Sequence, residues 1–147
     1  EYAWAFSHRG SRLPAFRFRD RAGRAIDGAA LRGQVTILNF WFTQCKPCIA
    51  EMPELNGLVA ANKGKSVLFI APTFEPERAV ATFLKRYPFE FRIVPGQKAW
   101  LDSLGFGTFP TTLVVDRKGV IRDVFIGAET DLSAKLQVAI DRLLTER

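Results

Sequence analysis

The stretch that most constrains this chain is an apolar run at residues 35–42 that leads into the sequence Cys45-Lys46-Pro47-Cys48. The run is rich in β-branched and aromatic residues and has little polar interruption, which is typical of a central strand covered on both faces. Pro47 fits the first turn of a helix, where a missing backbone N–H costs nothing. The pattern therefore predicts a buried strand, a short turn and a helix that begins at the cysteine pair.

The two cysteines of this motif are the only ones in the chain. At a helix start, unsatisfied N–H groups and the helix dipole stabilise a thiolate, and Lys46 adds a positive charge. We therefore expect Cys45 to attack a partner's disulfide and Cys48 to resolve the mixed disulfide. A zinc site would need two more Cys or His ligands, and His8 is the only histidine, so no metal is predicted.

The rest of the chain alternates predicted strands and helices. Strands are expected over about 15–19, 24–26, 66–71, 89–94, 112–116 and 120–126. Helices are expected over about 47–61, 75–86, 97–104 and 131–144, with Pro53 kinking the first, and a loop over 105–108. This order predicts one α/β domain with a mixed central sheet, helices on both of its faces and an N-terminal β-hairpin. We place the domain at residues 14–147 and expect residues 1–13 to be an extension whose Tyr2, Trp4 and Phe6 pack on it.

The net charge of +6 raises the question of a nucleic-acid partner. Phe16 and Phe18 alternate with Arg17 and Arg19, but this is also the pattern of an edge strand with Phe inside and Arg outside. We favour the edge strand and expect no nucleic-acid partner, whereas the charge suits acidic partners or an anionic membrane surface. No stretch approaches the roughly 18 apolar residues of a membrane span. The chain begins with Glu rather than Met, so we expect its natural start to be missing and leave a lost membrane anchor open.

The segment from Asn39 to Cys48 resembles the active-site stretch of the thioredoxin superfamily, and most of all its extracytoplasmic TlpA/ResA branch. Pro53 matches the helix-kinking proline of that family, and residues 109–111 match the loop whose cis-proline faces the cysteines. The likeness covers about residues 14–145. It implies a thioredoxin-like fold and a monomeric reductant of protein disulfides in the periplasm or an equivalent space. The Cys45–Cys48 disulfide is then the redox group, with no further cofactor. A membrane electron donor and cytochrome maturation proteins are partners left open.

The resemblance also suggests which residues assist the cysteines. Glu51 follows Cys48 by three residues and so shares its helix face. The resemblance implies that this acid relays protons and opposes the thiolate by its charge. The alternative is an early-helix acid favoured only by the helix dipole. Cytoplasmic thioredoxins usually carry a buried Asp at the position of Asn39, and this departure shifts the acid–base role toward Glu51.

The expected substrate-binding surface lies around the same loops. A cis bond is tolerable before Pro110, although an ordinary trans-Pro at a strand start is the alternative. The resemblance implies that the backbone of the preceding residue, Phe109, pairs with an extended substrate segment. Gln44 replaces the Trp commonly found before the first Cys, which leaves partner specificity open. For Trp41, packing in the core is an equal alternative to substrate contact. The residues predicted to bind substrate are Trp41, Lys46, Pro47, Phe109, Pro110 and Thr111.

Related folds also serve as peroxiredoxins and as copper chaperones. A peroxiredoxin would place Pro and Thr or Ser before its reactive Cys, and those positions hold Leu38 and Phe42. A copper chaperone of this fold would use two cysteines and a distal His, but His8 precedes the domain and no His lies near Pro110. Both alternatives fit the sequence less well than disulfide exchange.

Overall fold

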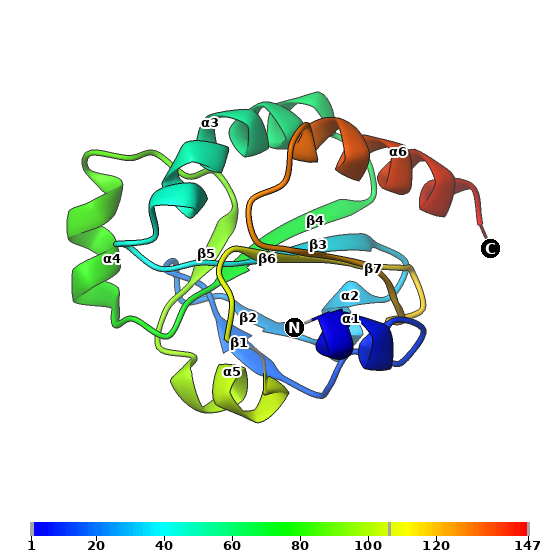
Figure 1. The fold of residues 1–147 in the computed structure, drawn as a ribbon, viewed down its shortest axis with the longest axis horizontal. Coiled ribbons are helices and arrows are strands. Elements are labelled where there is room, and N and C mark those ends of the chain that lie inside the picture. The colour runs from blue at the N-terminus through cyan, green and yellow to red at the C-terminus, as the bar shows by residue number, and fades with distance from the viewer. Residues whose placement is uncertain (1, 106, 147) are drawn as a thin grey trace.

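A five-stranded mixed sheet forms the centre of the computed structural model, which describes residues 2–105 and 107–146 apart from the side chains of Tyr2 and Phe6 (Figure 1). The strand order is β5-β4-β3-β6-β7, with β3–β4 and β4–β5 parallel and β3–β6 and β6–β7 antiparallel. The strands are β3 (Val35–Phe40), β4 (Val67–Pro72), β5 (Arg92–Val94), β6 (Thr111–Val115) and β7 (Ile121–Ile126). The mixed α/β sheet predicted from the sequence is confirmed.

Strand β3 is the middle strand of the sheet, and every one of its residues is buried. Val35 and Ile37 enter one hydrophobic core, and the alternate residues Leu38 and Phe40 enter the other. This follows from the twofold alternation of side chains along a strand whose two faces are both covered. The strand ends at Phe40, two residues earlier than the apolar run, because the chain then turns toward the cysteines.

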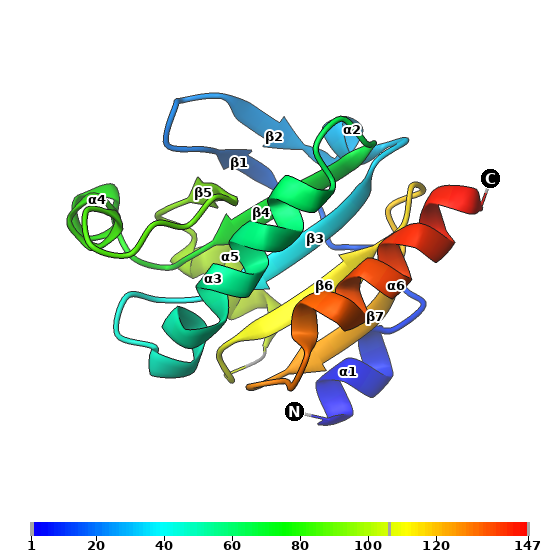
Figure 2. The ribbon, with the colours of Figure 1, turned by 90° about the horizontal axis from the view of Figure 1, so that it is seen from above.

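Helices cover both faces of the sheet, as predicted (Figures 1 and 2). Helices α3 and α6 lie on one face, and α4 adds Val80 and Phe83 to the same core. Helices α1, α2 and α5 and the hairpin β1–β2 lie on the other face. The bounds of the helices are α1 (Tyr2–His8), α2 (Gly28–Leu31), α3 (Lys46–Ala61), α4 (Glu77–Leu84), α5 (Lys98–Leu104) and α6 (Leu132–Thr145), and the hairpin consists of β1 (Arg17–Arg19) and β2 (Ala25–Asp27).

The N-terminal segment is held against β7. Its helix α1 buries Trp4, whose indole N–H donates to the carbonyl of Leu104. The chain then pairs with the strand edge, since Gly10 N–H donates to the Ile121 carbonyl at 2.7 Å and Ile121 N–H donates to the Ser11 carbonyl at 2.9 Å. The expected packing of Trp4 is confirmed. A helix was not predicted here, because it depends on this contact with β7 rather than on any local periodicity.

Several predicted boundaries differ from the structure, and some predictions lie outside the residues it describes. The strand expected over 89–94 begins only at Arg92, although Phe89 and Phe91 are buried in the core beside it. Pro53 lies inside α3, as expected. The side chains of Tyr2 and Phe6, residue Phe106 of the predicted loop, and the two terminal residues are not described. The boundary between residues 13 and 14 stays a prediction.

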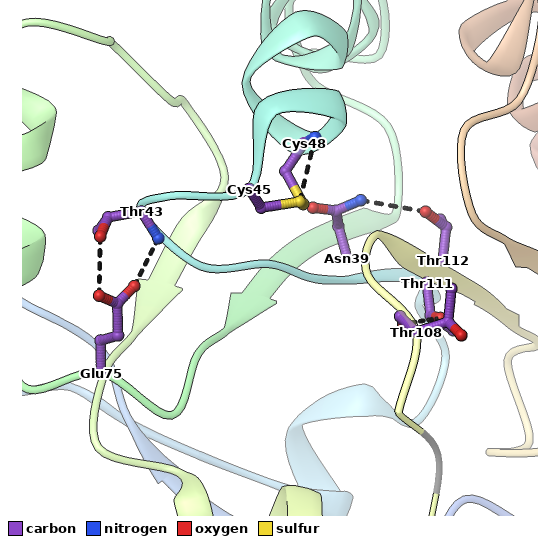
Figure 3. Close-up of a disulfide and its surroundings, with 8 residues drawn as sticks. All are labelled: Asn39, Thr43, Cys45, Cys48, Glu75, Thr108, Thr111 and Thr112. Atoms are coloured by element: carbon purple, nitrogen blue, oxygen red, sulfur yellow. Dashed lines mark hydrogen bonds between the residues drawn. A yellow bond between two sulfur atoms is a disulfide. The ribbon is translucent and has the colours of Figure 1, made fainter.

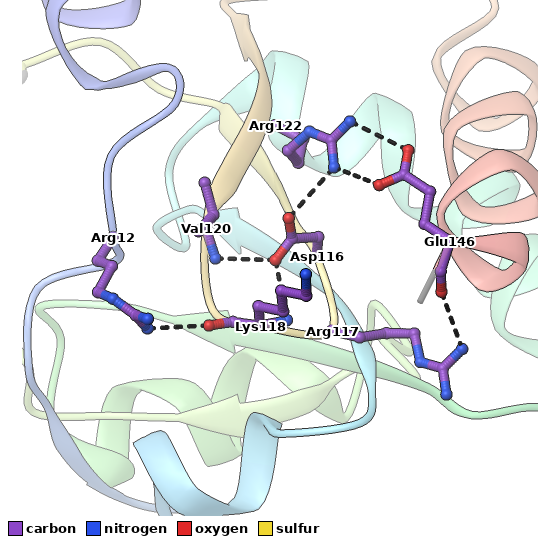
Figure 4. Close-up of polar contacts among 7 residues, drawn as sticks. All are labelled: Arg12, Asp116, Arg117, Lys118, Val120, Arg122 and Glu146. Atoms are coloured by element: carbon purple, nitrogen blue, oxygen red, sulfur yellow. Dashed lines mark hydrogen bonds and ion pairs between the residues drawn. The ribbon is translucent and has the colours of Figure 1, made fainter.

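A polar network around the buried Asp116 fixes the β6–β7 turn (Figure 4). Its carboxylate accepts hydrogen bonds from the N–H groups of Lys118 at 2.9 Å and Val120 at 3.0 Å, and from Arg122 at 3.2 Å. Burial raises the pKa of Asp116, but these N–H groups and Arg122 together hold it below its ordinary value. Arg122 also binds the carboxylate of Glu146 and so ties the turn to the end of α6.

We expect Asp116→Ala to lower the free energy of unfolding by about 2 kcal/mol, because it removes three hydrogen bonds and leaves Arg122 with one partner fewer. Urea denaturation of the oxidised protein at pH 7 measures this loss. The matched control is Asp102→Ala, which removes an exposed ion pair with Lys98 and should cost less than about 0.5 kcal/mol. Equal losses in the two variants would contradict the structural role of Asp116.

Candidate active site

The cysteine pair forms a disulfide at the start of α3 (Figure 3). The two Cα atoms of Cys45 and Cys48 lie 5.2 Å apart. Cys45 has extended backbone angles and caps the helix, and its sulfur accepts a hydrogen bond from the Cys48 N–H at 3.3 Å. Lys46 and Pro47 occupy the exposed first turn. The predicted order of strand, turn and cysteine-bearing helix is confirmed.

This geometry separates the roles of the two sulfurs. Cys48 is 1% exposed, whereas Cys45 is 4% exposed and lines a surface groove. After reduction, the helix N-terminus and the Cys48 N–H would favour negative charge on the Cys45 sulfur. Cys45 is thus the sulfur that a partner can approach, with Cys48 behind it.

The loop before β6 lies beside the disulfide because of the sheet register. Phe40, at the end of β3, pairs with Thr111, at the start of β6, so the residues that follow one strand face those that precede the other. The Phe109–Pro110 peptide bond is cis, as the family resemblance implies. The Thr111 hydroxyl donates to the Thr108 carbonyl at 2.7 Å and fixes the loop. Pro110 and Thr111 are themselves buried, whereas Phe109 is half-buried.

Glu51 lies one turn after Cys48 and is buried, with 6% of its surface exposed. Neither carboxylate oxygen has a hydrogen-bond partner among the described residues. The side chain faces a pocket of about 400 Å³, and the described residues that line it include three further acids and no basic side chain. The lining residues are Pro47, Ala50, Glu51, Glu54, Ala128, Glu129, Thr130 and Asp131.

These surroundings raise the pKa of Glu51 to about 7. The main cause is burial, which penalises the charged form, and the negative charges of Glu54 and Glu129 add to it. The backbone of Glu129 lies close enough to offset part of the rise, although it does not reach hydrogen-bonding geometry. A carboxyl group with this pKa can both accept and release a proton near neutral pH.

Asn39 lies in β3 beneath the disulfide (Figure 3). Its side-chain amide donates to the Thr112 hydroxyl at 3.0 Å, and both residues are buried. The amide therefore links β3 to β6 and brings no ionisable group to this position. Glu51 remains the titratable side chain closest in sequence to Cys48 on the buried face of α3.

The substrate role predicted for Trp41 is wrong. Its side chain is 0% exposed, and the indole N–H donates to the Ala71 carbonyl at 3.1 Å. Its ring contacts Phe83 and Phe89, at centroid distances of 5.3 and 5.6 Å. The side chain points into the core beneath α3 and α4, because Trp41 continues the alternation of β3. No surface is left for a partner to touch.

Sequence reasoning missed two residues of the β4–α4 loop that lie at the site. Phe74 contacts both Phe42 and Phe109 and is 38% exposed. Glu75 accepts hydrogen bonds from the backbone N–H and the hydroxyl of Thr43, on the loop before Cys45. Both residues are about 30 positions from the cysteines, and no local spacing marks them. The parallel pairing of β3 and β4 is what brings their loops together.

The described residues offer neither a metal site nor a membrane-spanning helix. They contain no group of three or more His, Cys, Asp or Glu side chains placed to hold a metal ion. None of their helices is long and apolar enough to cross a membrane. His8 stacks on Trp4 in α1, with ring centroids 4.1 Å apart, rather than joining the cysteines.

Comparison with known proteins gives consistent results. Residues 8–139 match the Redoxin family. The chain is 36% identical to the thiol–disulfide oxidoreductase ResA of Bacillus thuringiensis (strain Al Hakam), an alignment that covers 82% of the chain and 71% of the relative. It is 29% identical to the thioredoxin-like protein YneN of Bacillus subtilis (strain 168), over 90% of the chain and 79% of the relative. A crystal structure described as the thiol:disulfide interchange protein DsbE from Chlorobium tepidum superposes with a TM-score of 0.81 at 25% identity, over 92% and 97% of the two chains.

Proposed function

The chain belongs to the Redoxin family and is a ResA-like thiol–disulfide oxidoreductase, and from that premise we propose that its cysteine pair reduces protein disulfides outside the cytoplasm. The named relatives favour disulfide exchange over the peroxidase and copper-binding hypotheses. The likeness of the active-site segment to the extracytoplasmic TlpA/ResA branch supports the location. A monomer that receives its electrons from a membrane donor fits the same likeness.

The observation that carries the direction of transfer is the buried carboxyl group of Glu51, one turn from Cys48. A strongly oxidising dithiol owes its potential to a stabilised reduced form, whose attacking cysteine is a low-pKa thiolate. A buried acid surrounded by Glu54 and Glu129 opposes negative charge on the nearby sulfurs whenever it is ionised. The reduced form is then less favoured, which makes the pair a better electron donor.

The exchange itself takes two steps. The Cys45 thiolate attacks one sulfur of the partner's disulfide, forms a mixed disulfide and releases the other sulfur as a thiolate, which takes up a proton. Cys48 then loses its proton and attacks the Cys45 sulfur, which closes the Cys45–Cys48 bond and releases the partner's second thiolate. The partner gains two electrons and two protons, and the enzyme is left with the disulfide seen here.

We assign Glu51 the proton transfer in the second step. Cys48 is buried, so water has little access to its thiol, whereas Glu51 shares its helix face. With a pKa of about 7, the carboxylate can take the Cys48 proton and pass it to the adjoining pocket. Glu51 thereby acts as the general base for resolution of the mixed disulfide.

We propose that the partner docks along the loop that precedes β6. The backbone of Phe109 would pair with an extended partner segment. The buried residues Pro110 and Thr111 would hold the loop in position, the first through its cis peptide bond and the second through its hydrogen bond to Thr108. Lys46 and Pro47, exposed in the first turn of α3, would border the segment on the other side of Cys45.

The reduction potential of the Cys45–Cys48 couple, measured by equilibration with glutathione, tests the proposed direction. We expect a value near that of thioredoxin, about −270 mV, rather than one near −120 mV, which is typical of a strong oxidant. Cys48→Ser cannot form the internal disulfide, so it serves as the control that gives the signal of a protein without that bond. A value near −120 mV would mean that the protein oxidises its partners.

A further inference from the structure

Three phenylalanine rings form one wall of the groove beside Cys45. The ring centroids of Phe42 and Phe74 lie 5.6 Å apart, those of Phe42 and Phe109 lie 5.4 Å apart, and those of Phe74 and Phe109 lie 6.0 Å apart. The rings come from three loops, after β3, after β4 and before β6. We call them the phenylalanine triad. Two of the three pairs meet edge to face, the arrangement that aromatic rings favour.

The groove is open and mostly apolar. It has a volume of about 570 Å³, and among the described residues that line it Lys46 is the one charged side chain. Phe74 exposes 38% of its surface, whereas large hydrophobic residues of the described chain are otherwise buried or half-buried, except Val138 on α6. The lining residues are Phe42, Gln44, Cys45, Lys46, Pro47, Phe74, Gly107, Thr108 and Phe109.

Glu75 holds the triad in shape (Figure 3). Its carboxylate accepts hydrogen bonds from the Thr43 N–H at 2.5 Å and the Thr43 hydroxyl at 2.7 Å, so the loop that carries Phe74 is fastened to the loop that carries Phe42. Gly96 N–H donates to the Glu75 carbonyl at 2.7 Å and fixes the same loop from the β5 side. The three rings are thus already ordered before a partner arrives, which lowers the entropy cost of binding.

The two sides of the disulfide therefore differ in chemistry. The triad and Cys45 line the apolar groove, whereas Glu51, Glu54 and two more acids line the pocket on the other side of Pro47. In an extended segment, side chains two residues apart point to the same face. A partner cysteine that presents its sulfur to Cys45 also presents the side chain two residues away to this protein's surface.

We propose that the phenylalanine triad binds a large apolar side chain that lies two residues from the reactive cysteine of an oxidised partner protein, and that Phe74 determines this preference. The inference rests on the proposed function, which requires a partner disulfide at Cys45. The groove adjoins that sulfur directly, so the occupant is the partner segment already engaged in exchange. Glu75 is a positioning residue that acts through Thr43 and the loop of Phe42.

Two disulfide-bonded peptides, identical except for Phe or Ser two residues from one cysteine, test the preference. We expect kcat/KM of the reduced enzyme to be about tenfold higher for the Phe peptide, through a lower KM, because the buried ring gains apolar contact. In Phe74→Ala the ratio between the peptides should fall to nearly one. Val138→Ala, which trims an exposed apolar residue on α6, should keep the wild-type ratio.

The outcomes separate the two proposals. If the wild type reduces both peptides equally well, and Phe74→Ala behaves like it, the preference for an apolar side chain is wrong while reductase function stands. If the wild type reduces neither peptide, the proposed function is wrong and the inference falls with it. A preference that survives Phe74→Ala would overturn the role of Phe74.

The positioning role of Glu75 has its own readout. Glu75→Ala should raise the KM for the Phe peptide more than that for the Ser peptide, since it frees the loop of Phe42 from that of Phe74. Glu75→Gln keeps one oxygen to accept from the Thr43 N–H, so it should retain part of the preference. If Glu75→Ala leaves the ratio of kcat/KM between the two peptides unchanged, the hydrogen bonds from Thr43 to Glu75 do not position the triad.

Discussion

Replacing Cys48 with serine should turn the protein into a trap that stays bonded to its partner through Cys45. The serine hydroxyl is close in size to the thiol, so the buried position keeps its packing, but it cannot displace the partner from the mixed disulfide. We expect turnover to fall to the uncatalysed rate while a covalent adduct accumulates. Incubation with an oxidised substrate protein and mass analysis without reductant would detect an adduct that dithiothreitol releases.

The reciprocal variant, Cys45→Ser, is the control for this experiment. It leaves only Cys48, which is 1% exposed and does not line the groove, so little adduct should form. Alkylation of the reduced wild type should likewise modify Cys45 first. Adducts that form through Cys48 as readily as through Cys45, or a Cys45 that resists alkylation, would contradict the assignment of the nucleophile.

Glu51→Gln should remove a large pH dependence from the stability of the oxidised protein. The pKa of Glu51 is about 7 in the fold and near its ordinary value of 4.5 in the unfolded chain. Between these values the folded state binds more protons than the unfolded state, so stability falls as pH rises and the loss is complete above about pH 7. The shift corresponds to about 3 kcal/mol.

Urea denaturation at pH 5 and pH 8 measures this effect. The wild type should lose stability between the two pH values, whereas Glu51→Gln, which cannot ionise, should lose about 2.5 kcal/mol less, because pH 5 already lies above the unfolded pKa. Glu90→Gln removes an exposed carboxylate and should follow the wild type. If Glu51→Gln and the wild type have the same pH dependence, the carboxyl group of Glu51 is not held neutral by burial.

The same variant tests the influence of Glu51 on the cysteines of the reduced protein. Without its negative charge, a thiolate at Cys45 should form more easily, so the midpoint of the alkylation rate against pH should move to lower pH. The reduction potential should rise as well, because the reduced form becomes more favoured. If the alkylation rate of Cys45 depends on pH in the same way in Glu51→Gln and in the wild type, Glu51 has no part in the thiol chemistry.

Much of the site could be predicted because its signals are local. The apolar run of β3, the proline in the first turn of α3 and the three-residue spacings from Cys45 to Cys48 and from Cys48 to Glu51 lie within 20 residues of one another. Strand alternation and helix periodicity turn such spacings into positions. The cis bond before Pro110 is further away in sequence, and only the family resemblance pointed to it.

Other features depend on contacts between distant residues, which spacing does not report. The alternation of side chains along β3 turns Trp41 toward the core that contains Val35 and Ile37, and Phe83 and Phe89, which follow β4 in the sequence, complete its burial. Helix α1 packs against β7, and Gly10 and Ser11, which follow the helix, pair with the edge of that strand. In both cases the local pattern was compatible with two environments, and tertiary packing selected one of them.

The sequence by itself determined the chemistry of this protein: a strand that delivers two cysteines to a helix N-terminus, with an acid one turn further on. The tertiary structure decided the pKa of the acid and the shape of the surface that a partner meets. The pKa of Glu51 rises because the fold buries it beside Glu54 and Glu129, and the groove exists because sheet register brings Phe74 to Phe42 and Phe109. Bond-making capacity belongs to individual residues, whereas desolvation and surface shape arise only when distant segments pack together.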